Sequence, residues 1–178
     1  SKNICFEGNF IVGKSDQKSD IFDVLIFARR DIKLALIPSK IKKFNTGVFR
    51  NTYYLKYVEF LGDSQLQHID DYVFCHSSIY CFSMPPKIYY LPNDIFVKSK
   101  IQLIEINDYS NLQDFNINYL PKKREVIILI STNVVGRFDL NLGSENQEQL
   151  PLKKNSENKI HISDDSYSGP LDICDLFG

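Results

Sequence analysis

The sequence predicts a repeat solenoid, mainly β with short helical turns, built from about five repeats of 22–25 residues and preceded by an N-terminal β-hairpin cap. The first observation behind this prediction is an apolar pattern that recurs at nearly constant intervals through residues 32–138. The second is an aromatic residue that recurs at the same place near the end of the repeats. The 13 Phe and 10 Tyr also favour strands over helices.

Each repeat opens with a short strand whose apolar residues stand at positions i, i+3 and i+5. The repeats begin at Ile32, Leu55, Ile79, Ile101 and Val126, at intervals of 23, 24, 22 and 25 residues. These intervals fall within the range of roughly 20–29 residues that leucine-rich repeats use. The last copy is degenerate, because Ser131 occupies its third apolar position.

A second short strand follows in each repeat, and a closing residue comes five positions after its last apolar residue. The closing residues are Phe49, Phe74, Phe96 and Leu120. A continuous amphipathic helix would keep its period of about 3.6 residues, whereas this pattern restarts in every repeat. The connectors alternate between a short form with proline and a longer acidic form, so equivalent points recur after 46 or 47 residues.

Residues 1–31 lie outside the repeat pattern and predict a capping β-hairpin. Phe10–Val12 and Val24–Ala28 are short apolar runs on either side of the polar stretch Lys14–Asp20. The end of a repeat array exposes an apolar face that needs a cover. We therefore expect this hairpin to cover the first repeat.

One stretch of this segment, Gly8–Ser15, has the spacing G-x-x-x-x-G-K-[ST] of a phosphate-binding loop. That motif needs a loop followed by a helix, whose N-terminal N–H groups bind the phosphates. Here the interior is Phe10-Ile11-Val12, which favours a strand, and no amphipathic helix follows. A nucleotide-binding enzyme is thus the less favoured alternative to a strand that ends in a glycine turn.

Three stretches carry a family resemblance: IPSKIKKFNTGVF (37–49), LKYVEFLGDSQLQHIDDYVF (55–74) and MPPKIYYLPNDIF (84–96). Their alternation resembles the BspA-like leucine-rich repeats of bacterial and protist surface proteins, and residues 10–41 are similar to a non-repeat insert of protist members. The resemblance covers about residues 6–120. It implies a leucine-rich repeat solenoid that binds partners without catalysis, as a surface antigen or adhesion protein. The family's usual Cys after the closing Phe is displaced or absent, and the Asn ladder of common leucine-rich repeats is missing.

Beyond Phe138 the repeat pattern is lost, and residues 139–178 predict a polar, weakly ordered C-terminal tail. The stretch 141–165 consists mostly of Glu, Gln, Lys, Asn and Ser. Such residues bury too little apolar area to offset the entropy that ordering costs.

The residues between the inward positions predict an outward face, because side chains alternate along a strand. Its two expected columns are Leu34, Tyr57, Cys81, Leu103, Ile128 and Leu36, Glu59, Ser83, Glu105, Ile130. The second strands predict another, more polar face. Exposed aromatic and aliphatic side chains on a solenoid favour protein binding over an ordinary sheet surface. The candidate partner-binding residues are Leu34, Leu36, Tyr57, Glu59, His68, Ser83, Tyr89, Leu103 and Glu105.

The remaining features predict no enzyme, no cofactor and no metal. The formal net charge of -1 gives no basic excess for a nucleic-acid partner. The histidines lie in unrelated contexts, and Cys75, His76 and Cys81 supply one ligand too few for tetrahedral zinc.

The expected function is therefore protein or glycan binding by a monomer. The resemblance implies the cell surface or secretion, and an intracellular scaffold is the alternative. No run of the sequence approaches the ~20 apolar residues of a membrane-spanning helix.

Overall fold

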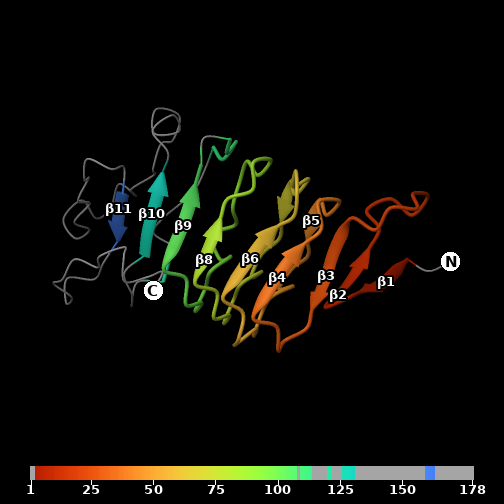
Figure 1. Ribbon diagram of the computed structural model, residues 1–178, viewed down its shortest axis with the longest axis horizontal. Helices are drawn as coiled ribbons and strands as arrows, with labels where there is room; N and C mark the ends of the chain where they lie inside the picture. Colours follow the sequence, from red (N-terminus) through yellow and green to blue (C-terminus); the bar gives the residue numbers. More distant parts are fainter. Residues whose placement is uncertain (1–2, 108, 114–119, 122–125, 131–158, 163–178) are drawn as a thin grey trace.

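Short strands joined by tight turns make up the regular structure (Figure 1). A computed structural model describes residues 3–107, 109–113, 120–121, 126–130 and 159–162. The strands are β1 (Ile4–Glu7), β2 (Phe10–Gly13), β3 (Val24–Ala28), β4 (Leu34–Ile37), β5 (Lys43–Phe44), β6 (Tyr57–Phe60), β7 (His68–Ile69), β8 (Cys81–Ser83), β9 (Leu103–Ile106), β10 (Val126–Ile130) and β11 (Lys159–Ile162). These described residues contain no helix, and hydrogen-bonded turns stand where short helical turns were predicted.

The strands form two sheets that enclose one apolar core, so the predicted repeat solenoid is confirmed. Sheet B runs in the order β11-β10-β9-β8-β6-β4, and sheet A in the order β1-β2-β3-β5-β7. The opening strands of the repeats, β4, β6, β8, β9 and β10, are parallel neighbours in sheet B. The second strands β5 and β7 are parallel neighbours in sheet A.

The strand register agrees with the predicted repeat spacing except in the last copy. Leu34 pairs with Tyr57, Tyr57 with Cys81, and Cys81 with Leu103, which are offsets of 23, 24 and 22 residues. Leu103 pairs with Ile127, so the last offset is 24 residues and not the predicted 25. The inward and outward positions of β10 are therefore shifted by one residue from those predicted.

The closing aromatic residues form a ladder inside the solenoid. Phe49 and Phe74 stack with ring centroids 5.4 Å apart, and Phe74 and Phe96 stack with centroids 5.6 Å apart. All three side chains are fully buried, and Phe82 of β8 packs its ring against both Phe74 and Phe96. The recurrence of Phe at the closing position thus reflects one continuous aromatic stack.

The two apolar runs of the N-terminal segment pair in antiparallel fashion as β2 and β3, and β1 adds a third strand. β3 also pairs in parallel with β5, in the way that β5 pairs with β7. Phe10 of β2 places its ring edge-to-face on Phe49, with centroids 6.4 Å apart. The segment therefore continues sheet A and packs onto the first ring of the aromatic ladder.

Buried hydroxyl groups bind the backbone at the turns, where an Asn ladder is missing. The hydroxyls of Ser64, Ser77, Ser99 and Ser110 each accept a hydrogen bond from the N–H two residues later. The Thr52 hydroxyl donates to the Phe49 carbonyl at 2.6 Å. Small hydroxyl side chains therefore satisfy backbone groups that would otherwise be buried without a partner.

The three repeats that close with Phe each have a residue in the left-handed backbone region two positions after that Phe. These residues are Asn51, His76 and Lys98, with φ of 60°, 56° and 53°. A side chain in this conformation costs free energy that glycine avoids, and Asn tolerates it best. We expect His76→Gly to raise the free energy of unfolding by about 0.5–1 kcal/mol in a urea titration. Arg50→Gly is the control, and its φ is not positive. It should lower stability, and a loss of stability in His76→Gly as well would contradict the prediction.

Most of the predicted tail, residues 139–178, lies outside the described residues. Its described part, Lys159–Ile162, forms β11 and pairs antiparallel with β10. The weak order of residues 139–178 therefore stays a prediction.

Candidate functional site

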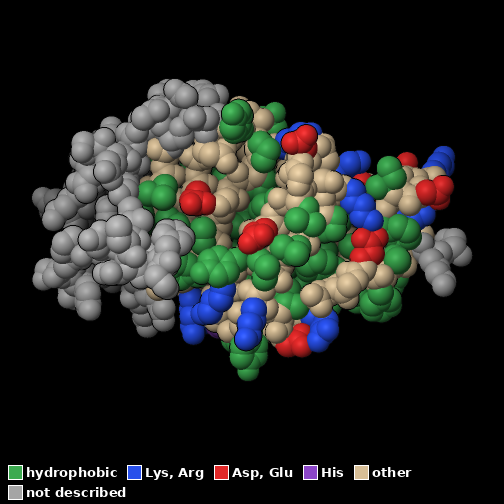
Figure 2. All heavy atoms as spheres, in the orientation of Figure 1, with side chains coloured by type: hydrophobic (Ala, Val, Ile, Leu, Met, Phe, Trp, Pro, Cys, Tyr) green, Lys and Arg blue, Asp and Glu red, His purple; other side chains and the backbone are tan. Residues whose placement is uncertain are grey.

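The outer face of sheet B brings together seven of the nine predicted binding residues. Leu34 and Leu36 lie on β4, Tyr57 and Glu59 on β6, Ser83 on β8, and Leu103 and Glu105 on β9. The cross-strand register aligns them in two rows, in which Leu34 pairs with Tyr57 and Leu36 with Glu59. Figure 2 looks onto this sheet and shows acidic side chains that stand apart from each other among hydrophobic ones.

Exposure is greatest toward the β4 end of this face. Leu34 is 38% exposed, Leu36 is 43% exposed and Tyr57 is 49% exposed. Leu103, predicted as an exposed member, is only 8% exposed. We name the exposed set Leu34, Leu36, Tyr57 and Glu59 the β4–β6 patch.

Two residues predicted to face outward, Ile128 and Ile130, face the core instead. They pair with the buried residues Ile104 and Ile106, and both are themselves buried. The outward positions of β10 belong to Ile127 and Leu129, which pair with Leu103 and Glu105.

Polar contacts link β8 and β9 in the middle of the face. The Ser83 hydroxyl donates a hydrogen bond to the Glu105 carboxylate. Burial raises the pKa of the Cys81 thiol to about 11, and the nearby Glu105 charge adds to this effect. The thiol therefore stays protonated at neutral pH, which makes it a poor nucleophile and a poor metal ligand. Tyr57 and Tyr80 pack edge-to-face beside it, with centroids 6.5 Å apart.

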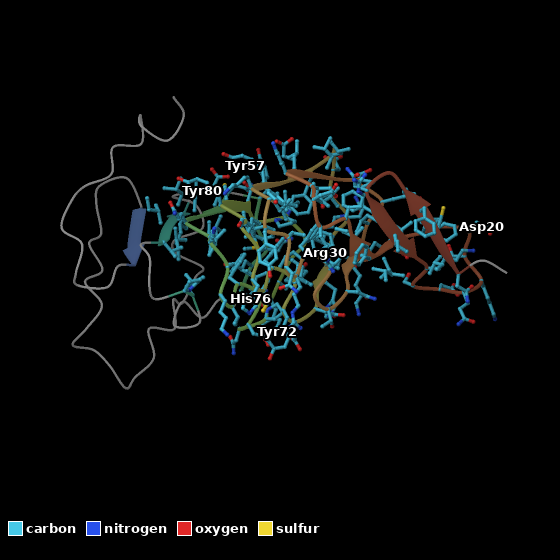
Figure 3. All side chains as sticks on the ribbon, turned by 90° about the horizontal axis from the view of Figure 1, so that it is seen from below. Asp20, Arg30, Tyr57, Tyr72, His76 and Tyr80 are labelled. Atoms are coloured by element: carbon cyan, nitrogen blue, oxygen red, sulfur yellow. The ribbon has the colours of Figure 1, made fainter. Side chains whose placement is uncertain are left out.

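His68 and Tyr89, the other two predicted residues, lie away from sheet B. His68 belongs to β7 of sheet A, where its Nε2 lies 2.9 Å from Asp70, which also binds Lys43 at 3.0 Å. Tyr89 is exposed and lies in the second-strand segment of the next repeat, between Ile88 and Leu91. The nine residues therefore form two separate surfaces. Figure 3 likewise shows Tyr57 and Tyr80 on one side of the solenoid, and Tyr72 and His76 on the other.

The stretch Gly8–Ser15 contains β2, not a phosphate-binding loop, and its motif residues contact the protein itself. Lys14 lies over the Phe22 ring at 5.0 Å. A Cβ at Gly13 would come 2.6 Å from the Ile26 Cδ1 atom, so close strand packing explains this glycine.

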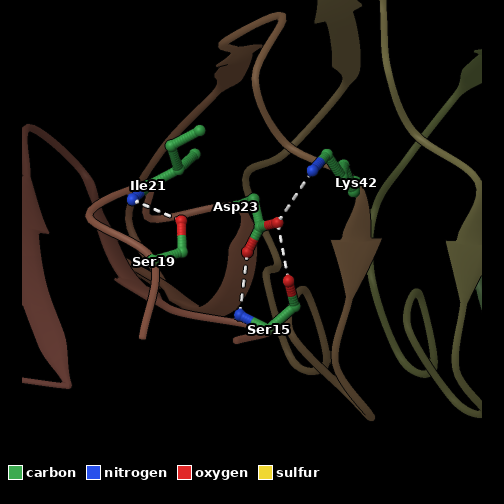
Figure 4. Close-up of polar contacts among 5 residues, drawn as sticks. All are labelled: Ser15, Ser19, Ile21, Asp23 and Lys42. Atoms are coloured by element: carbon green, nitrogen blue, oxygen red, sulfur yellow. Dashed lines mark hydrogen bonds and ion pairs between the residues drawn. The ribbon is translucent and has the colours of Figure 1, made fainter. Parts of the chain in front are cut away.

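Ser15 binds the buried carboxylate of Asp23 in the same hairpin (Figure 4). Its N–H donates to Asp23 Oδ1 at 2.8 Å and its hydroxyl to Oδ2 at 2.7 Å, and Lys42 Nζ lies 3.3 Å from Oδ2. Burial alone would raise the pKa of Asp23, but the bonds from Ser15 and the Lys42 charge outweigh it and lower that pKa. No signal in the sequence pointed to this cluster except the P-loop-like spacing.

The described part of the chain holds no group of three or more His, Cys, Asp or Glu side chains that could bind a metal ion. Cys5, Cys75 and Cys81 are free thiols. Nor does any helix among the described residues have the length and hydropathy to span a membrane.

The comparisons with known proteins concern the repeats. The model of the family described as "BspA type Leucine rich repeat region (6 copies)" matches residues 22–135. A solved structure with similarity to the chain is a leucine-rich repeat protein from Eubacterium ventriosum, with 19% sequence identity and a TM-score of 0.41. That match covers 61% of this chain and 30% of the other, so the chain spans less than a third of that protein. No curated protein matches the sequence.

Proposed function

The chain belongs to the BspA-type leucine-rich repeat family, and we propose that it is a non-enzymatic module that binds a protein partner on the outer face of sheet B. The observation that carries the proposal is the β4–β6 patch. Leu34, Leu36 and Tyr57 expose large apolar side chains on two hydrogen-bonded neighbouring strands. The free energy falls when a partner covers water-exposed apolar side chains that lie side by side.

The patch also has features that suit a specific protein contact. Its side chains project from a sheet whose backbone is fixed by the neighbouring strands, so little further ordering is needed on binding. Tyr57 offers a large ring that contacts Tyr80, and aromatic residues of this kind often dominate interface energies. The adjacent Glu59 is exposed and makes no ion pair with a described residue, so it favours a partner that brings a basic group to the same place.

Tyr57→Ala tests the proposal against the matched variant Tyr89→Ala. Both residues are about half exposed, at 49% and 54%, but they lie on different surfaces. For a partner captured by cross-linking to the 32–138 segment, Tyr57→Ala should weaken the affinity by about 2 kcal/mol, or roughly 30-fold, in a calorimetric titration. Tyr89→Ala should leave it within about twofold. Equal losses for both variants, or no loss for Tyr57→Ala, would show that the partner binds elsewhere.

Family membership and the exposed β4–β6 patch lead us to favour a role in adhesion or as an antigen at the cell surface, with a glycan as a less favoured partner. An intracellular scaffold would use the same face in another compartment. Labelling intact cells with an impermeant reagent separates the two settings. Failure to label the protein would count against the surface role.

A further inference from the structure

Positively charged side chains gather in the turns that lead into the parallel strands of sheet B. We name these turns the turn edge, and it consists of residues 29–33, 51–56, 76–80 and 98–102. The third of them runs from the side of the solenoid that carries His76 to Tyr80, next to the start of β8 (Figure 3). Six of its seven charged side chains are Lys or Arg. Among the other side chains that the structure describes, seven are basic and ten acidic. The formal net charge of -1 therefore conceals a positive edge, and Figure 2 shows basic side chains gathered beneath the strands.

Backbone hydrogen bonds between successive repeats hold one residue of each turn in a row along the turn edge. The N–H of Lys56 donates to the Lys33 carbonyl at 2.8 Å, and the N–H of Tyr80 donates to the Lys56 carbonyl at 2.9 Å. Gln102 continues the row by donating to the Tyr80 carbonyl at 2.9 Å. Neighbouring strands lie about 4.8 Å apart, so the row from β4 to β9 extends over about 14 Å. Lys98 and Lys100 lie in the turn that leads to β9.

The four lysines of the turn edge share the absence of an anionic partner. No described carboxylate lies within 4.0 Å of the ammonium groups of Lys33, Lys56, Lys98 or Lys100, all of which are exposed. By contrast, Lys14, Lys40, Lys42 and Lys43 are each ion-paired. Like charges at neighbouring positions across strands repel each other. An anion that lies along the edge would relieve this repulsion.

We propose that the turn edge binds a sulfated polysaccharide, which lies along the solenoid axis across successive turns. Lysine suits sulfate, because its ammonium is a compact point charge that needs no bidentate geometry. Tyr80 and Gln102 follow the two lysines in the row and can exchange hydrogen bonds with sugar hydroxyls. Clusters of basic side chains are a common basis for binding sulfated polysaccharides.

Two other anionic partners fit the edge less well. An acidic peptide would find no free backbone ladder to join, because the N–H groups of Lys56, Tyr80 and Gln102 are already bonded. Duplex DNA is read by a helix or a two-stranded ribbon in its major groove, and this edge is made of turns. A single-stranded nucleic acid is a closer competitor, because its bases stack on aromatic rings and Tyr53 and Tyr54 of the edge are exposed. The test therefore includes single-stranded DNA.

Titration of the 178-residue chain with a heparin oligosaccharide tests the proposal, with K33Q/K56Q as the variant. K18Q/R50Q is the matched control, because it removes the same charge from two exposed side chains without ion pairs elsewhere. At about 50 mM salt K33Q/K56Q should bind heparin about tenfold more weakly than the unmodified chain, with a shallower dependence of log K on log salt. K18Q/R50Q should bind within about twofold of the unmodified chain. Thermal unfolding of both variants checks that they fold.

Three results would overturn the proposal. The first is a lack of heparin binding by the unmodified chain at low salt. The second is an equal loss in K18Q/R50Q, which would indicate attraction by overall charge alone. The third is equal or tighter binding of poly-glutamate or of single-stranded DNA with a matched number of charges, which would assign the edge to another anion.

Discussion

Phe74→Ala should lower the free energy of unfolding by about 3–5 kcal/mol, as the removal of a fully buried phenyl ring does when the surroundings cannot collapse into the space. The site has little freedom to collapse, because Phe74 stacks between Phe49 and Phe96 and also contacts Phe82. Urea titrations followed by circular dichroism give the measurement. The transition should also broaden, because a break in the middle of a repeat array uncouples its two ends.

Tyr89→Ala serves as the reference for this experiment. Its ring is 54% exposed, so the free energy of unfolding should change by less than about 0.5 kcal/mol. A loss of less than about 1 kcal/mol in Phe74→Ala would show that the aromatic ladder does not support the solenoid.

Asp23→Asn should cost about 2–3 kcal/mol of stability at pH 7, because the buried carboxylate accepts two hydrogen bonds from Ser15. The nearby Lys42 ammonium is about half exposed, so water screens its attraction to the Asp23 carboxylate, and this ion pair contributes little to the stability. Asn keeps the shape of the side chain but carries no charge, and its NH₂ group can donate where the protein needs an acceptor. Urea titration at pH 7 gives the difference from the unmodified chain.

The free energies of unfolding of the unmodified chain and of the Asp23→Asn variant should converge as the pH falls. The folded-state pKa of Asp23 lies below its ordinary value of 3.8, so the unfolded chain takes up the proton first. The stabilisation by the carboxylate is therefore complete above about pH 5 and is lost as the pH falls below about 4 through the folded-state pKa. The amide of the Asp23→Asn variant has no proton to gain over this range. A difference between the two proteins that is as large at pH 2 as at pH 7 would contradict this assignment.

The repeat pattern was predictable because each turn must bury the same small set of side chains. Ile104 and Ile106 are fully buried as their i+3 and i+5 positions require, and the closing Phe residues stack as their recurrence suggests. Such positions are dictated by local spacing, and several copies of the pattern support one another.

The register of β10 was not predictable in the same way. Val126–Ile130 is apolar at all five positions, so alternation cannot tell which side chains face the core. The prediction began this repeat at Val126, the first residue of the run, whereas the pairing of Leu103 with Ile127 sets the repeat one residue earlier. That choice moved Ile128 and Ile130 to the wrong side.

Contacts between residues from different parts of the chain were also beyond the sequence pattern. Asp23 and Lys42 stand 19 residues apart, and no motif contains both. The lysines of the turn edge are scattered along the chain and gather only because parallel strands all begin at one edge. The net charge, which counts residues without placing them, gave no sign of this edge.

The way in which successive repeats stack also determines how the molecule would respond to being stretched. Its strands lie across the long axis, so each turn of 23 residues, from Leu34 to Tyr57, adds only about 4.8 Å to the length of the sheet. The same 23 residues measure roughly 80 Å when pulled straight. Unfolding one turn would therefore lengthen the chain by far more than that turn adds to the folded solenoid. Tension along the axis would unfold the turns one at a time, because each turn contacts only its neighbours.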